Sequence, residues 1–88
     1  MKLYMDVELR FGGRCGVEAR SPDLRLTSHG LDESEALQSL RRGVVAWCEG
    51  LRLIGKLEKV LREKGLNWEG DGKSVLVELH PVNSRVNS

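Results

Sequence analysis

The side chains that could perform catalysis or bind a metal are few and scattered along this chain. Its 88 residues include two histidines and two cysteines. His29 and His80 each stand alone, without the second ligand three to five positions away that zinc sites use. Cys15 and Cys48 are too far apart for a short zinc motif and too few for a disulfide framework. Both cysteines fall on apolar faces, so we expect buried free thiols, no metal, no cofactor and no enzyme active site.

One acidic cluster could suggest a cation site, but it has a simpler interpretation. Asp32, Glu33 and Glu35 lie directly before an apolar helical pattern. Acidic residues in a first helical turn are stabilised by the helix dipole. The Asp32 side chain can accept from the backbone N–H of Glu35, and Glu35 can reach back to the cap, as in a capping box. The cluster therefore predicts the start of a helix.

Positive charge is concentrated between residues 52 and 64. The cations of this segment are Arg52, Lys56, Lys59, Arg62 and Lys64, set against two glutamates. A basic helix can neutralise phosphates. The segment has no interleaved aromatic residues and no surrounding helix-turn-helix pattern. Two interpretations stay open: a solvated polar face, or a weak nucleic-acid-binding face made by Arg52, Lys56, Lys59 and Arg62.

The composition is that of a small soluble domain. With 14 Lys and Arg against 13 Asp and Glu, the net charge is +1, which excludes a globally basic nucleic-acid binder. No apolar run approaches the roughly 18–20 residues that cross a bilayer, and the N-terminus lacks a signal-peptide pattern. We therefore expect a cytoplasmic protein that does not contact membranes. A chain this short is marginally stable alone, so we also expect a homo-oligomer.

Alternating residues predict the strands that must position these side chains. Residues 3–11 alternate strictly between apolar and polar types, the period of a half-buried antiparallel strand. Gly12-Gly13 can form a tight turn, and the alternation resumes over residues 15–20, which predicts a hairpin. Ser21-Pro22-Asp23 ends the second strand, because proline lacks the ladder donor. A short third strand is predicted over residues 24–28.

A long apolar stripe follows the third strand. Apolar residues recur at three- and four-residue spacing from residue 36 to residue 61, more than one small sheet covers. Trp47 lies within this stripe, and both a core and an interface position stay open for it. Trp68 lies outside regular structure and could sit at a subunit contact. The expected partner or oligomer interface comprises Trp47, Leu51, Ile54 and Trp68.

Residues 33–64 can form one helix or two. Gly50 and Gly55 interrupt the pattern, so either the helix runs on or it breaks near Gly50. In the second case another helix covers about residues 52–64. We favour two helices, the second ended by Gly65 in the left-handed conformation.

The C-terminal part completes the predicted fold. Residues 67–73 read as a turn, and residues 74–79 form a final strand closed by His80-Pro81. The predicted order is β-β-β-α-α-β, an α+β fold in which a small antiparallel sheet carries helices on one face. We expect a single domain over residues 1–82 and a flexible tail over residues 83–88.

Three short motifs between residues 16 and 51 carry a family resemblance. Residues 17–24 end in Pro-Asp-Leu, residues 27–30 read Thr-Ser-His-Gly, and residues 31–37 open an acidic helix. In this order they resemble the N-terminal domain of the HicB-like antitoxin family. That domain has a hairpin, a P-D-L segment, a strand ending in T-x-G and an acidic helix start. Arg25-Leu26 replaces the Pro-Gly-Cys that follows P-D-L in the family.

The resemblance implies a non-catalytic domain that oligomerises and masks a small RNA-cleaving toxin of the HicA type. Many family members carry a C-terminal DNA-binding segment, and this sequence shows only one strand and a short tail after its helices. The operator binding of the family is therefore not carried over. Two alternatives stay open: an oligomeric structural or regulatory protein of unrelated role, and the weak nucleic-acid-binding module described above.

Overall fold

The first strand of the chain organises the sheet. In the computed structural model, which describes residues 1–13, 16–70 and 74–82, β1 (Lys2–Gly13) pairs antiparallel with β2 (Gly16–Ser21). β3 (Leu26–Gly30) pairs antiparallel with β2. The start of β1 pairs antiparallel with β4 (Asn67–Glu69) and parallel with β5 (Leu76–Val82). β1 therefore has hydrogen-bonded neighbours on both of its edges.

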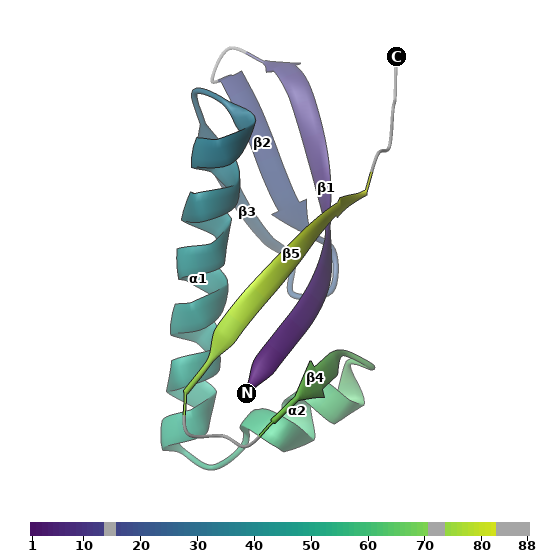
Figure 1. The fold of residues 1–88 in the computed structure, drawn as a ribbon, viewed down its shortest axis with the longest axis vertical. Coiled ribbons are helices and arrows are strands. Elements are labelled where there is room, and N and C mark those ends of the chain that lie inside the picture. Colours follow the sequence, from purple (N-terminus) through teal and green to yellow (C-terminus); the bar gives the residue numbers. More distant parts are fainter. Residues whose placement is uncertain (14–15, 71–73, 83–88) are drawn as a thin grey trace.

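Two helices cover one face of this sheet (Figure 1). α1 (Glu33–Leu53) runs along the long axis of the molecule, packs against β2 and β3 and touches β5. The short α2 (Leu57–Glu63) lies at the end of the molecule where β1 starts. Its buried residues Leu57 and Leu61 belong to the same apolar cluster as the inner face of the sheet. The α+β fold class with helices on one face is thus confirmed.

The core is built from two periodic patterns that face each other. Alternate residues of the strands point inward, and every fourth residue of α1 points back at them. The core members of β1, β2 and α1 are Leu3, Met5, Val7, Val17, Ala19, Ala36, Leu40, Val44 and Cys48. Each of these side chains is at most 7% exposed. The predicted antiparallel hairpin is confirmed, but β1 runs through Gly12 and Gly13, where the turn was predicted, and Gly13 pairs with Gly16.

The C-terminal half of the sheet differs from the prediction in two ways. Residues 67–69 form β4 where a turn was expected, because Trp68 pairs with Leu3 across a ladder too short to show a period. β5 runs parallel to β1, so the sheet is mixed and not wholly antiparallel. β5 also continues through Pro81 to Val82 instead of ending at Leu79. The physical reason is the direction of the Pro81 backbone, which faces away from β1.

The two predicted helices are present, but the break between them lies at Gly55 and not at Gly50. α1 continues through Gly50, whose cost in a helix interior is only about 1 kcal/mol. At the break, the N–H of Gly55 donates to the carbonyl of Arg52 (3.1 Å) and the N–H of Lys56 to that of Leu51 (2.9 Å). This pair of hydrogen bonds requires a residue with a left-handed backbone conformation, and Gly55 has a φ of 72°. Gly65 ends α2 in the same way, as predicted.

Some expectations fall on residues that the structure does not describe. Cys15, part of the predicted turn at residues 71–73 and the tail at residues 83–88 lie outside the described ranges. Within those ranges, neither helix is long and apolar enough to span a membrane.

The junction between β3 and α1 is packed so closely that it requires a glycine. A Cβ atom added to Gly30 would lie 2.4 Å from the backbone nitrogen of Ala36 and 2.8 Å from the carbonyl carbon of Glu35. Both atoms belong to the first turn of α1, so neither can move without shifting the helix. Gly30 therefore fixes how closely the helix start approaches the sheet.

We predict opposite effects for two glycine-to-alanine substitutions. Gly30→Ala should lower the free energy of unfolding by roughly 1–3 kcal/mol through overpacking. Gly43→Ala, within α1 where an added Cβ meets nothing within 4 Å, should raise it by about 1 kcal/mol through helix propensity. Urea unfolding followed by circular dichroism measures both. A Gly30→Ala variant as stable as Gly43→Ala would contradict the packing argument.

Candidate partner interface

The face of the sheet opposite the helices is polar, and its charges are paired across strands. Lys2 Nζ lies 2.9 Å from Glu78 Oε2, joining β1 to β5. The Tyr4 ring stacks on the His80 ring with centroids 6.2 Å apart. The hydrogen bond from Lys2 lowers the pKa of Glu78, and the same bond raises the pKa of Lys2. This face therefore presents neutralised pairs and not a field of one sign.

The two histidines lie on separate strands. His29 is on β3, where its Nε2 is 3.4 Å from Glu18 Oε1 of β2. His80 is on β5, with Nε2 3.4 Å from Glu78 Oε1. β2 and β1 separate these strands in the sheet. Among the described residues, no group of three or more His, Cys, Asp or Glu side chains could hold a metal ion.

Cys48 is part of the core. Its side chain is fully buried between α1 and the sheet, as the helical stripe predicted. Burial, with a smaller contribution from Glu49, raises the pKa of the thiol to about 11. A buried thiol with a raised pKa is a poor nucleophile. Cys48 therefore contributes packing to this protein.

The structure separates the four residues predicted to form an interface. Trp47 and Leu51 are partly buried and pack against the core from α1. Trp68 lies on β4 and faces the same side of the sheet as Leu3, with the Arg62 guanidinium 6.0 Å above its ring. Ile54 alone of the four is mostly solvent-exposed, at 64%.

An exposed apolar residue next to Ile54 was missed by the sequence analysis. Leu53 is 79% exposed and directly precedes Ile54 at the end of α1. The apolar spacing assigns Leu53 to the stripe of a second helix that starts near residue 52. In the structure Leu53 is instead the last residue of α1, outside the buried face of that helix, so it faces solvent. The two neighbours form an apolar tip at one end of the molecule.

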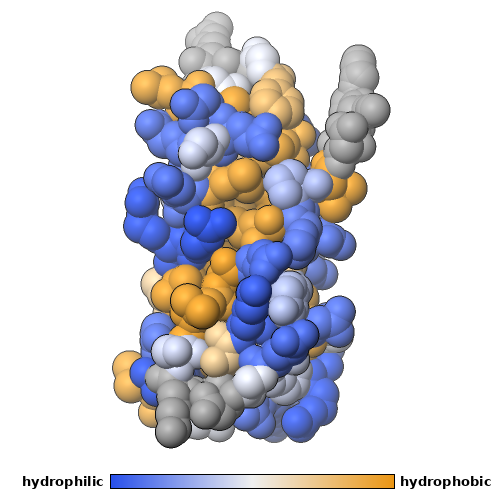
Figure 2. Space-filling view, viewed as in Figure 1, coloured by the Kyte–Doolittle hydropathy of each residue, from blue (hydrophilic) through white to orange (hydrophobic). Residues whose placement is uncertain are grey.

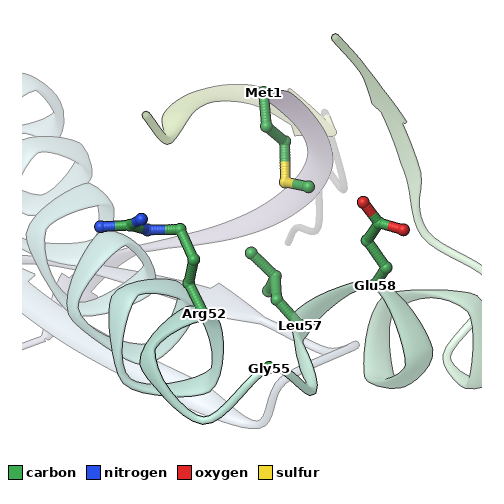
Figure 3. A pocket seen from close by; sticks show the side chains of 5 residues that line it. All are labelled: Met1, Arg52, Gly55, Leu57 and Glu58. Carbon is green, nitrogen blue, oxygen red and sulfur yellow. The ribbon is translucent and has the colours of Figure 1, made fainter. Parts of the chain in front are cut away.

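A small hollow lies beside this tip (Figure 3). It has a volume of about 190 Å³ and is lined by Met1, Arg52, Gly55, Leu57 and Glu58. Met1 reaches from the start of β1 toward Leu57, and Arg52 and Glu58 flank them. Ligand pockets are usually about 300–1,000 Å³, so this hollow suits a single side chain of a partner better than a cofactor. We call Leu53, Ile54 and this hollow the junction surface.

Two of the four residues of the predicted basic face contact other side chains of the chain. Arg52 Nε is 2.7 Å from Glu49 Oε1, and Arg62 covers Trp68. Lys56 and Lys59 are exposed at the start of α2 and make no ion pair within residues 1–13, 16–70 and 74–82. Fewer positively charged side chains are therefore available to a ligand than the sequence predicts.

Comparison with known proteins adds no relative: no family model, curated protein or solved structure matches this chain. The chemistry of the surfaces described above, together with the motifs of the sequence, is the basis for a functional proposal.

We predict that Cys48 does not react with thiol reagents in the native state. In a Cys15→Ser background at pH 8, a disulfide reagent should leave the thiol intact until denaturant is added. Folding raises the pKa of the Cys48 thiol above its ordinary value of 9.0. The contribution of the protonated thiol to the free energy of unfolding should therefore be fully present below pH 9.0 and be lost as the pH rises toward 11. The loss should reach about 1.4 kcal/mol per pH unit and be absent in Cys48→Ala. Rapid native labelling at pH 8 would contradict this.

Proposed function

We propose that this chain is a HicB-like, non-catalytic binding protein that masks a small RNA-cleaving toxin of the HicA type. The observation that carries the proposal is where the resembling motifs lie in the fold. Pro22-Asp23-Leu24 lies in the turn between β2 and β3, and residues 27–30 end β3. Asp32 caps α1. The three motifs thus lie in the β2–β3 turn, in β3 and at the start of α1, in the order that the family resemblance implies.

The motif residues at the helix start have a local structural role. The N–H of Glu35 donates to Asp32 Oδ1 (2.8 Å), which confirms the predicted cap. The Glu35 carboxylate accepts from the N–H of Leu31 (2.9 Å), one residue before the cap. These two hydrogen bonds position the start of α1, which gives the motif residues a structural role. An apolar surface elsewhere is a stronger candidate for contact with a toxin.

The junction surface is the best candidate for that contact. Leu53 and Ile54 are large, apolar and exposed, and the hollow next to them offers a concave site for an anchoring side chain. Protein interfaces take much of their binding energy from such apolar anchors. Arg52 and Glu58 at the edge of the hollow would supply a polar rim. Together these features favour a protein partner.

The toxin hypothesis is tested on the small protein encoded by the neighbouring reading frame. The two proteins are co-expressed with a tag on one of them, and growth and co-purification are measured. We expect the chain to rescue growth and to co-purify with the toxic neighbour. A neighbour that is neither bound nor neutralised would remove the antitoxin role.

A matched pair of substitutions locates the contact. Ile54→Lys should weaken toxin binding by about tenfold or more, equivalent to at least about 1.4 kcal/mol, because a charge replaces an apolar anchor. Phe11→Lys is the control, since Phe11 is equally exposed (62%) and lies near the end of β1, at the opposite end of the long axis (Figure 1). Isothermal titration calorimetry measures both affinities. Equal loss in the two variants would place the contact elsewhere.

A weak nucleic-acid-binding role is the second candidate, favoured by the exposure of Lys56 and Lys59 without an ion pair within the described residues. If these lysines contact phosphates, the Lys56→Glu/Lys59→Glu variant should bind more weakly and show a salt slope of log K that is smaller by about 2. Arg41→Glu/Arg42→Glu on α1 is the control and should change neither. Fluorescence anisotropy with labelled RNA at several salt concentrations measures this. No binding by the unaltered chain at low salt would end this candidate.

A further inference from the structure

The backbone of β5 has a defined inner and outer edge. The N–H of Leu76 donates to the carbonyl of Met1 (2.9 Å), and the Met1 ammonium donates to the carbonyl of Ser74 (2.6 Å). Because backbone groups alternate in direction along a strand, Glu78 and His80 also face β1. The N–H and C=O groups of Val77 and Leu79 therefore point away from β1. No described strand pairs with this outer edge.

Pro81 limits the outer edge at one end. By the same alternation its missing N–H lies on the outer side, so the ladder with β1 is intact. A strand added outside β5 would find no hydrogen-bond donor at Pro81. It would find both an N–H and a C=O group at each of three residues: Val77, Leu79 and, just before the strand, Val75. The usable edge is therefore the segment from Val75 to Leu79.

The other sheet edges are protected in ways that β5 is not. β4 has only three residues, and β3 is short, carries Thr27, Ser28 and His29 and packs along α1. Short, polar or covered strands resist the addition of a further strand. The Val75–Leu79 segment has a single charged residue, Glu78, which is already paired with Lys2.

Apolar surface adjoins this edge. Figure 2 shows a strip of apolar residues between α1 and β5, with polar residues on both sides. Val77 and Leu79 of β5, and Val75 just before it, point to the inner face and are buried, at 8% exposure each. A strand placed beside β5 would pair the outer backbone groups and also cover part of this strip.

We propose that the outer edge of β5 pairs antiparallel with β5 of a second copy of this chain, about a two-fold axis at Val77. In this register Val77 faces Val77, Val75 faces Leu79, and Leu76 faces Glu78 of the second copy. Every outward N–H from Val75 to Leu79 then meets an outward carbonyl, and both Pro81 residues lie outside the paired span. The sheets of the two copies join into one.

Other registers of the same pairing are less favourable. A two-fold axis at Glu78 places the two Glu78 carboxylates opposite each other, and like charges in that position are destabilising. An axis at Leu79 places Pro81 opposite Val77, so the outward carbonyl of Val77 finds no N–H donor. An axis at Leu76 leaves Leu79 opposite residue 73, before β5 begins. The sequence of β5 is therefore self-complementary about Val77, which is the reason for assigning the edge to a second copy.

Disulfide trapping tests the edge and its register together. In a Cys15→Ser/Cys48→Ala background, Leu76→Cys and Glu78→Cys each place one thiol on the polar face of β5. Directly opposite residues of this type have Cα atoms about 4.5 Å apart, within the range of a disulfide. Mild oxidation of the two variants mixed should yield at least tenfold more cross-linked dimer than either variant alone. Leu76→Cys, which keeps Glu78, cross-linking alone as strongly as the mixture, or no cross-link in the mixture, would overturn the proposal.

Val77→Pro provides a second measurement. It removes an outward donor in the way Pro81 already does and leaves the ladder with β1 intact, so the fold should survive by circular dichroism. Sedimentation velocity should show a dimer for the unaltered chain and a monomer for Val77→Pro at the same concentration. An unaltered chain that is monomeric at every concentration, or a folded Val77→Pro variant that remains a dimer, would overturn the proposal. The cross-linking result decides the question if Val77→Pro does not fold.

Discussion

The pairing of β1 on both edges is the interaction on which the rest of the structure depends. Its first residues hydrogen-bond to β4 on one side and to β5 on the other, while its second half pairs with β2. The inward side chains Leu3, Met5 and Val7 are at most 2% exposed because both neighbours and the helices surround them. Removing either neighbour would expose the centre of the core. The C-terminal strand is therefore essential to a core that the N-terminal hairpin begins.

The parallel pairing of β5 with β1 imposes the long path between β3 and β5. Strands that run in the same direction cannot be joined by a tight turn. After β3 the chain must therefore return along the molecule to the end where β5 starts. α1 makes most of that crossing and extends past Gly50 for this reason, since its buried face continues to Cys48 and its packing to Leu51. The turn at Gly55 then sets α2 against the start of β1. The apolar tip at Leu53 and Ile54 is a product of this geometry.

The sequence predicted what local signals encode and missed what depends on tertiary pairing. The alternation of apolar and polar residues predicted the hairpin. Local hydrogen-bonding patterns predicted the Asp32 cap and the end of α2 at Gly65. Strand direction carries no local signal, so the parallel β5 was not foreseen. His80-Pro81 predicts a strand end, whereas the actual effect of this proline depends on which way its missing N–H would point. In the candidate site, the exposure of Ile54 and the partial burial of Trp47 and Trp68 were likewise set by packing.

The distribution of charge favours recognition through apolar and backbone groups. The polar face of the sheet carries ion pairs across strands, as Lys2 forms with Glu78 and Arg20 with Glu8. Arg52 and Arg62 are likewise engaged by Glu49 and Trp68. A chain with a net charge of +1 creates little overall field to attract a polyanion. Within the described residues, the apolar tip of α1 and the outer edge of β5 are two surfaces that no other element covers. Because these lie on different elements, the proposed protein partner and the proposed second copy would bind through separate surfaces.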